Sequence, residues 1–209
     1  MKKTIYMLVL VTACFAFSGT VIAQTKPILF GLNYNYAAPL GGFKSDVISN
    51  GSARGFSGSF MYPVNKKWQL GLSAGFQDFY QKYPRDIYTT GNHETTSAVL
   101  SNSIQIIPVL AKATYLPMGN SNTFIQPYIS AASGISLVDF RQYLGEFGSN
   151  SSNAVFTVQA GAGITMPFKR GKDAGLDIGA GYNYVGYQKF GINNLNHLTA
   201  NVGVHFPLR

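Results

Sequence analysis

Apolar and polar residues alternate with a period of two along most of this chain. The alternation is clearest over residues 68–77, where Trp, Leu, Leu, Ala and Phe occupy every second position and Gln, Gly and Ser lie between them. This period is typical of a β-strand with one apolar face, because successive side chains of a strand point to opposite sides. The pattern recurs and predicts eight strands and no helix. The predicted strands cover residues 30–36, 56–62, 68–77, 98–115, 124–140, 156–168, 176–184 and 198–206.

The polar faces of these strands consist of small residues. Gly, Ser, Thr, Asn and Gln dominate them, and such residues cannot form a hydrophobic core. The apolar faces therefore lie outside, the reverse of a soluble barrel. Several runs are long enough to cross a bilayer, which takes about 9–11 tilted residues. The sequence thus predicts an all-β fold, a closed antiparallel transmembrane β-barrel of eight strands in an up-and-down meander. A secreted carrier of lipocalin type would need an apolar lumen, which the polar faces argue against.

The connections between the predicted strands alternate in length. Outer-membrane barrels have short periplasmic turns and longer extracellular loops, and the same layout is expected here. The short connections are residues 63–67, 117–123 and 169–173, and the mostly longer ones are 38–53, 83–97, 141–153 and 188–194.

Aromatic residues gather where each predicted strand would meet the lipid headgroups. Two aromatic belts of this kind are expected of an outer-membrane barrel. The belt at the turns contains Tyr62, Trp68, Tyr115, Phe124, Phe168 and Phe206, and the belt at the loops contains Tyr36, Phe56, Phe76, Tyr80, Phe140, Phe156 and Tyr184.

The composition agrees with a lipid-facing surface. Charged residues are 11% of the 209 residues, less than half of the roughly 25% usual for a soluble domain. The 14% aromatic content argues against disorder, and one Cys excludes a disulfide scaffold. No run of about 18–20 apolar residues is present, which excludes a helical membrane protein.

The first 23 residues have the layout of a secretory signal peptide. Lys2 and Lys3 precede an apolar stretch over residues 5–17, and a Val-Ile-Ala sequence ends at Ala23. We therefore expect cleavage after Ala23, a mature barrel domain over residues 24–209, and export to the outer membrane of a diderm bacterium. The alternative is lipidation at Cys14, which follows a sequence similar to a lipobox.

The positive charge of the chain does not indicate a nucleic-acid partner. The net charge is +8, and it falls to +6 without Lys2 and Lys3. A nucleic-acid binder would gather this charge on one face. Here the basic residues are scattered or lie in turns, as Lys66, Lys67 and Lys172 do. We expect outer-membrane lipid and lipopolysaccharide as partners, no nucleic acid, and a monomer.

Four short sequences resemble the eight-stranded outer-membrane β-barrel domain family, the OmpA/OmpX-like and porin-like group. They are residues 104–110 (IQIIPVL), 126–129 (QPYI), 161–163 (GAG) and 203–208 (GVHFPL). The resemblance extends over the whole mature chain and implies the fold and the outer-membrane location. These loose patterns do not imply an activity.

The sequence offers little for catalysis or metal binding. The three His residues and the absence of Cys from the mature chain predict no metal site and no cofactor. His93 and Glu94 are expected to be a solvated pair in a loop. His197 and His205 are eight residues apart on one inward face, about 26 Å at the usual strand rise, and each should hydrogen-bond within the lumen. The outward face lacks a Ser–His–acid set, so a lipid-A-modifying enzyme is disfavoured and no enzyme is predicted.

Lys112 and Asp177 are the predicted charged residues of the lumen. An eight-stranded barrel is narrow enough for them to form an ion pair across it. The favoured role of this pair is a structural plug, and the alternative is a gate in a narrow channel for small solutes.

The loops are the other candidate site, because binding functions are often carried by loops on a rigid scaffold. The sequence thus predicts a non-enzymatic outer-membrane barrel with a plugged lumen, which serves envelope structure or surface interaction. The loop ligand is unknown, and the loops can equally be variable segments without a fixed partner. Pro108 and Pro127 lie within predicted strands and are expected at bulges or strand ends. The candidate loop residues are Lys44, Arg54, Tyr83, Arg85, Tyr88, Arg141 and Tyr143.

Overall fold

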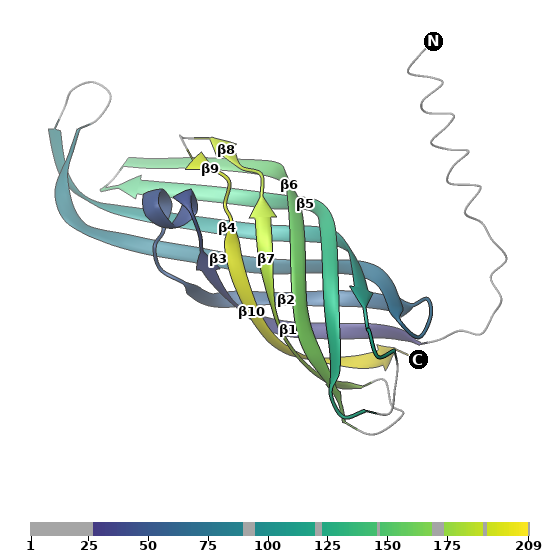
Figure 1. Cartoon of the computed structure of the whole chain (residues 1–209). Helices are drawn as coiled ribbons and strands as arrows, with labels where there is room; N and C mark the ends of the chain where they lie inside the picture. Colours follow the sequence, from purple (N-terminus) through teal and green to yellow (C-terminus); the bar gives the residue numbers. More distant parts are fainter. Residues whose placement is uncertain are drawn as a thin grey trace, which may run out of the picture.

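The chain forms a closed eight-stranded antiparallel β-barrel in a computed structural model (Figure 1). Each strand pairs with its neighbours in chain order, and the last strand closes the ring on the first, so the predicted fold class is confirmed. The structure describes residues 27–89, 95–119, 123–145, 147–168, 174–189 and 192–208. The predicted signal peptide and the His93–Glu94 pair lie outside these residues. The barrel strands are β1 (Ile28–Pro39), β2 (Ser52–Pro63), β3 (Trp68–Thr89), β4 (Thr95–Tyr115), β5 (Gln126–Leu144), β6 (Phe147–Pro167), β7 (Gly175–Val185) and β10 (His197–Leu208).

The outer surface of the barrel is apolar, as the alternation predicts. In β3, Trp68, Leu70 and Leu72 are exposed, whereas Gln69 and Ser73 on the opposite face point to the lumen and are half-buried. The described residues contain no helix long and apolar enough to span a membrane.

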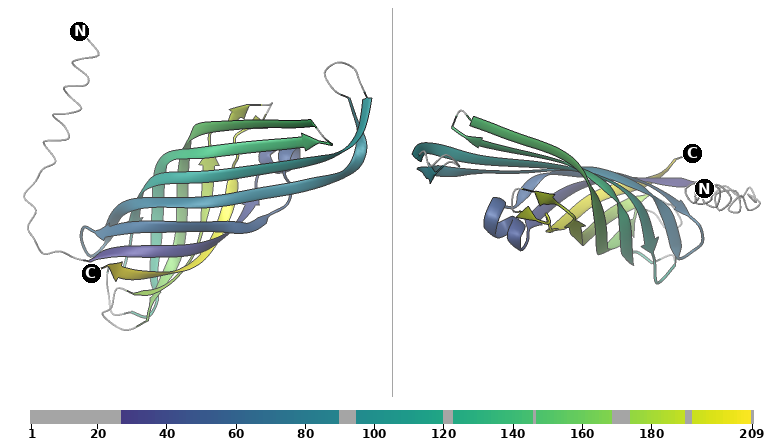
Figure 2. Two further views of the ribbon diagram at one scale, coloured as in Figure 1. Left: turned by 180° about the vertical axis from the view of Figure 1, so that it is seen from behind. Right: turned by 90° about the horizontal axis from the view of Figure 1, so that it is seen from above.

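Four neighbouring strands are much longer than the rest, and here the loop predictions are wrong. β3 to β6 have 19–22 residues, and β1, β2, β7 and β10 have 11 or 12. The hairpins β3–β4 and β5–β6 therefore project beyond the barrel (Figure 2) and occupy most of the predicted loops 83–97 and 141–153. The six small polar residues 148–153 show no alternation, because a strand outside the membrane needs no apolar face. The residues predicted in loops that lie in strands are Arg54, Tyr83, Arg85, Tyr88, Arg141 and Tyr143.

The predicted loop over residues 38–53 contains a short helix that the periodicity did not predict. This element, η1 (Phe43–Val47), is a single π-helical turn that follows Gly41, whose φ of 57° lies in the left-handed region. After β7, the strands β8 (Gln188–Lys189) and β9 (Ile192–Asn193) form a separate two-stranded sheet. We call the end of the barrel with η1 the loop end and the opposite end the turn end.

The two prolines have different places in the sheet. Pro127 is the second residue of β5, before the first residue that pairs with β4, so it lies at a strand end as predicted. Pro108 lies inside β4 and pairs with Ser136 of β5. On the β3 side, the ladder is interrupted between the Ala74–Val109 and Gln77–Ile106 pairs without a change of register. Pro108 therefore interrupts the ladder without a bulge, and the expectation that it lies at a bulge or a strand end is wrong.

Candidate functional site: the barrel lumen

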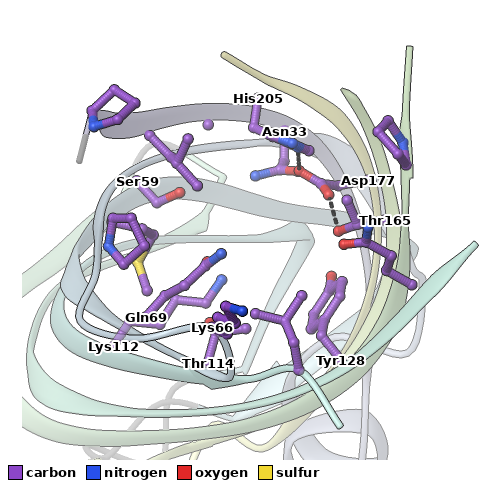
Figure 3. Close-up of a pocket in the computed structure, with 18 of the residues that line it drawn as sticks. Asn33, Ser59, Lys66, Gln69, Lys112, Thr114, Tyr128, Thr165, Asp177 and His205 are labelled. Atoms are coloured by element: carbon purple, nitrogen blue, oxygen red, sulfur yellow. Dashed lines mark hydrogen bonds and ion pairs between the residues drawn. The ribbon is translucent and has the colours of Figure 1, made fainter. Parts of the chain in front are cut away.

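The turn end of the lumen holds a cavity of about 400 Å³ with a mixed polar and apolar lining. Side chains from all parts of the ring reach into it (Figure 3). Most come from strand positions that alternate with the lipid-facing ones, so the period of two that builds the outer surface also builds most of the cavity, whereas Lys66 reaches it from the turn after β2. The polar and charged residues that line it include Asn33, Ser59, Lys66, Gln69, Lys112, Thr114, Tyr128, Thr165, Asp177, Asn201 and His205.

Asp177 is the centre of a hydrogen-bond network on one wall of this cavity. Its carboxylate contacts Nδ1 of His205 on the neighbouring strand β10 at 2.7 Å. The other carboxylate oxygen accepts a hydrogen bond from Oγ1 of Thr165 on β6 at 2.6 Å. His205 thus points inward and bonds within the lumen as predicted, and its partner is the lumen carboxylate. The sequence placed both residues inside but could not pair them, because the pairing depends on the register between β7 and β10.

Lys112 lines the same cavity from β4. In Figure 3 it lies beside Gln69, Lys66 and Thr114, on the side of the cavity away from Asp177. Among the described residues, the ion-pair partner of Asp177 within 4 Å is His205. The structure therefore brings both predicted residues to one cavity, and a direct Lys112–Asp177 ion pair stays a prediction.

Glycines on two strands make room for the ring of Tyr128. A Cβ atom at Gly163 of β6 or at Gly179 of β7 would lie 2.6 Å from the Tyr128 hydroxyl oxygen. Such contacts are too short for a real side chain, so both positions require glycine while the ring stays in place.

The middle of the lumen is narrower and is filled by polar side chains. A second cavity of about 100 Å³ lies here. Thr157 donates its hydroxyl to Ser136 at 2.6 Å, and the Asn183 amide donates to Thr199 at 3.0 Å. His197 is buried at the upper limit of this layer, with Nδ1 3.0 Å from the carbonyl oxygen of Leu195. It points inward, as predicted.

An apolar layer fills the lumen at the loop end, which the sequence did not predict. Phe43 of η1 packs edge-on against Phe79 of β3, with ring centroids 5.0 Å apart, and Phe79 packs in the same way against His197 at 5.5 Å. Phe140, predicted in the outer aromatic belt, is buried in this layer, so that assignment is wrong. We call this layer the loop-end cap; its members are Ala37, Phe43, Val47, Ile48, Phe79, Ile104, Ile106, Val138, Phe140, Val185, Tyr187, Ile192 and Leu195.

Hydrogen bonds from the projecting strands hold η1 in the cap. The carbonyl oxygen of Val47 accepts from the Tyr83 hydroxyl at 2.9 Å and from the Asn102 amide at 3.0 Å. At the end of the helix, the backbone N–H of Ser49 donates to Oε1 of Gln81 at 2.5 Å. A signal was present in the sequence, because Phe43 and Val47 are four residues apart, the spacing of one helical face.

Charged residues lie on the outside of the barrel just above its apolar surface. Arg54 forms an ion pair with Asp78 at 3.2 Å and lies 5.9 Å from the ring of Tyr80. On β5, Arg141 pairs with Asp139. These arginines, predicted in loops, instead project outward from the strands at the upper edge of the apolar surface.

The described part of the chain contains no cluster of three His, Cys, Asp or Glu residues that could hold a metal ion. Inside the lumen, the Asp177 carboxylate contacts the imidazole of His205 and the hydroxyl of Thr165.

Comparison with solved structures gives the same fold. Neisserial surface protein A is 18% identical, with a TM-score of 0.51 over 87% of this chain and 96% of that chain. The outer membrane protein OprG from Pseudomonas aeruginosa is 14% identical, with a TM-score of 0.53 over 88% of this chain and 97% of that chain. Both are eight-stranded outer-membrane β-barrels, which confirms the resemblance at the level of the fold. No protein-family model matches the sequence, and the comparison with curated proteins gives no significant match.

Proposed function

We propose that this protein is a non-enzymatic integral outer-membrane barrel with a closed lumen, which acts through its projecting surface. It is exported with a signal peptide over residues 1–23 that is removed, and it sits as a single barrel with its loop end outside the cell. The apolar outer surface between the two aromatic belts supports this location.

The loop-end cap is the observation that supports a closed lumen. Its side chains fill the mouth of the barrel, and Phe43, Ile48 and Phe79 are fully buried. Water and small ions do not pass a packed apolar layer, since each would lose its hydrogen bonds there. Below the cap, the polar middle layer leaves only a small cavity.

Conductance across a planar bilayer tests this closure. We expect the refolded protein to insert without conductance steps, and heat-modifiable gel migration to confirm that it is folded. Replacing Phe43 and Val47 together by Ser should loosen the cap and produce steps. Lys44→Ser in the same helix is the matched control, because Lys44 is exposed, and it should stay silent.

Steps from the unaltered protein would contradict the closed lumen and favour the second candidate, a narrow channel for small solutes. The cavity of about 400 Å³ at the turn end, with its charged and polar side chains, is the observation that favours this alternative. In that case Lys112 and Asp177 would be the residues expected to set its ion selectivity.

The basic residues above the apolar surface suggest contact with lipopolysaccharide. The Arg54 side chain is two-thirds exposed in spite of its ion pair, so its guanidinium can also reach phosphate groups at the membrane surface. Replacing Arg54 and Arg141 by Gln should reduce retention of purified lipopolysaccharide on the folded barrel. Unchanged retention would remove this part of the proposal.

A further inference from the structure

The cavity at the turn end contains more positive than negative charge. Two lysines, Lys66 and Lys112, line it against one carboxylate, that of Asp177. Both oxygens of this carboxylate are engaged, one by Thr165 and the other by His205. Neither lysine has a carboxylate within 4 Å among the residues that the structure describes. The unmatched charge of the cavity is therefore cationic, and a single negative charge would balance it.

The cross-strand neighbours of Lys112 leave its ammonium to the cavity. The residues directly opposite it in the ladder are Gly71 on β3 and Ala132 on β5. Neither has a polar side-chain atom, so these two positions supply no acceptor. An ammonium has three N–H donors and is costly to enclose without acceptors. In Figure 3, Lys112 and Lys66 lie on the side of the cavity away from Asp177. This side is suited to an anionic group.

The deeper part of the cavity is lined by groups that bind hydroxyls. Apolar lining residues lie close to the turn end, where Leu29 begins β1 after one residue and Pro63 and Pro167 end their strands. Amide and hydroxyl side chains lie further from the strand ends, those of Asn33, Ser59 and Asn201. An apolar ligand would leave these groups without hydrogen bonds, whereas hydroxyl groups both donate to them and accept from them.

We propose that the turn-end cavity binds a small hydroxylated carboxylate of the sugar-acid class. The inference rests on the proposed closed lumen, so the ligand enters from the periplasmic turn end and does not pass the loop-end cap. Its carboxylate lies against Lys112 and Lys66, and its hydroxyl groups meet the amides and hydroxyls deeper in the cavity. The volume of about 400 Å³ is within the range of small-molecule sites, roughly 300–1,000 Å³.

A titration of gluconate into the folded, isotope-labelled barrel in detergent micelles, followed by NMR, tests the proposal. We expect saturable shifts of the amide signals around Lys112 and unchanged signals around Phe43 in the cap. Lys112→Met should weaken binding about tenfold or more, because it removes a charged donor, and Lys66→Met should weaken it less. Lys67→Met is the matched control. Lys67 is the exposed neighbour of Lys66 outside the cavity lining, and its loss should leave the affinity unchanged.

Two matched probes test the ligand class on the unaltered protein, so this result does not depend on the folding of a variant. Glucose has the hydroxyl groups without the charge, and butyrate has the charge without the hydroxyl groups. Each should bind about tenfold more weakly than gluconate or worse, because each leaves one set of lining groups without a partner.

Three results would overturn the proposal: no saturable shifts with gluconate, equal affinity for glucose or butyrate, or unchanged affinity in folded Lys112→Met. Each of them would leave the closed lumen in place, because its test is conductance across a bilayer without gluconate. Conductance steps from the unaltered protein would instead overturn the closed lumen, so the two failures are distinguishable.

Discussion

Pairs of residues on neighbouring strands organise the lumen of this barrel. Asp177 meets His205 and Thr165 on the strands at either side of its own, and Tyr128 lies over Gly163 and Gly179. The inward direction of these residues could be predicted from the period of two. Their partners could not, because they depend on the stagger between strands, which the alternation leaves open.

Removal of the Asp177 charge should weaken the turn-end network. Asp177→Asn keeps the shape of the side chain but loses the charged acceptor for His205. We expect the free energy of unfolding to fall by about 1–3 kcal/mol in a urea titration in lipid vesicles. Thr165→Val, which removes one bond, should cost about 0.5–1.5 kcal/mol. An unchanged free energy of unfolding in Asp177→Asn would show that the network does not stabilise the fold.

A double-mutant cycle tests the predicted interaction of Lys112 with Asp177. Lys112→Met and Asp177→Asn should each lower the free energy of unfolding, and the two decreases should not be additive in the double variant. We expect a coupling energy of about 0.5 kcal/mol or more in the same titration. Additive losses would show that the two charges act independently.

The space over Gly179 gives a further residue-scale prediction. Gly179→Ala should displace the Tyr128 ring and lower the free energy of unfolding by about 1–3 kcal/mol. Gly58→Ala is the matched control, since the nearest atom to its added Cβ is 3.8 Å away. Equal effects of the two substitutions would argue against the tight fit of Tyr128.

At the scale of elements, the alternation predicted the strands where one face contacts lipid. It did not predict their projecting parts, which need no apolar face. The cap was missed for a related reason. Inward positions such as Ile106 become apolar at the loop end, and Ile106 and Ile107 are then apolar neighbours with opposite directions. The alternation disappears there, although the strand continues.

The cap also predicts how η1 behaves. Phe43→Ala removes its largest buried contact and should release the segment from the barrel. We expect hydrogen exchange of the Lys44, Ser45 and Ile48 amides, which are hydrogen-bonded within the loop, to become markedly faster. Exchange of the β4–β5 ladder should not change. Unchanged protection of the loop would mean that its hydrogen bonds to Tyr83, Asn102 and Gln81 hold it without the apolar packing.

At the scale of the whole molecule, the proposed membrane location depends on the inverted polarity of the barrel. The outside is apolar and charge-poor, polar side chains line the lower two layers of the lumen, and the apolar cap lies at the loop end. The most direct test is spin labelling of three successive residues of β10 in lipid vesicles. Ala200 and Val202 point outward, and Asn201 between them lines both cavities. Labels at Ala200 and Val202 should be accessible to oxygen dissolved in lipid and shielded from a water-soluble nickel complex, whereas a label at Asn201 should have low oxygen access. Ready access of the nickel complex to Ala200 and Val202 would show that these positions face water, and it would contradict the lipid-facing barrel.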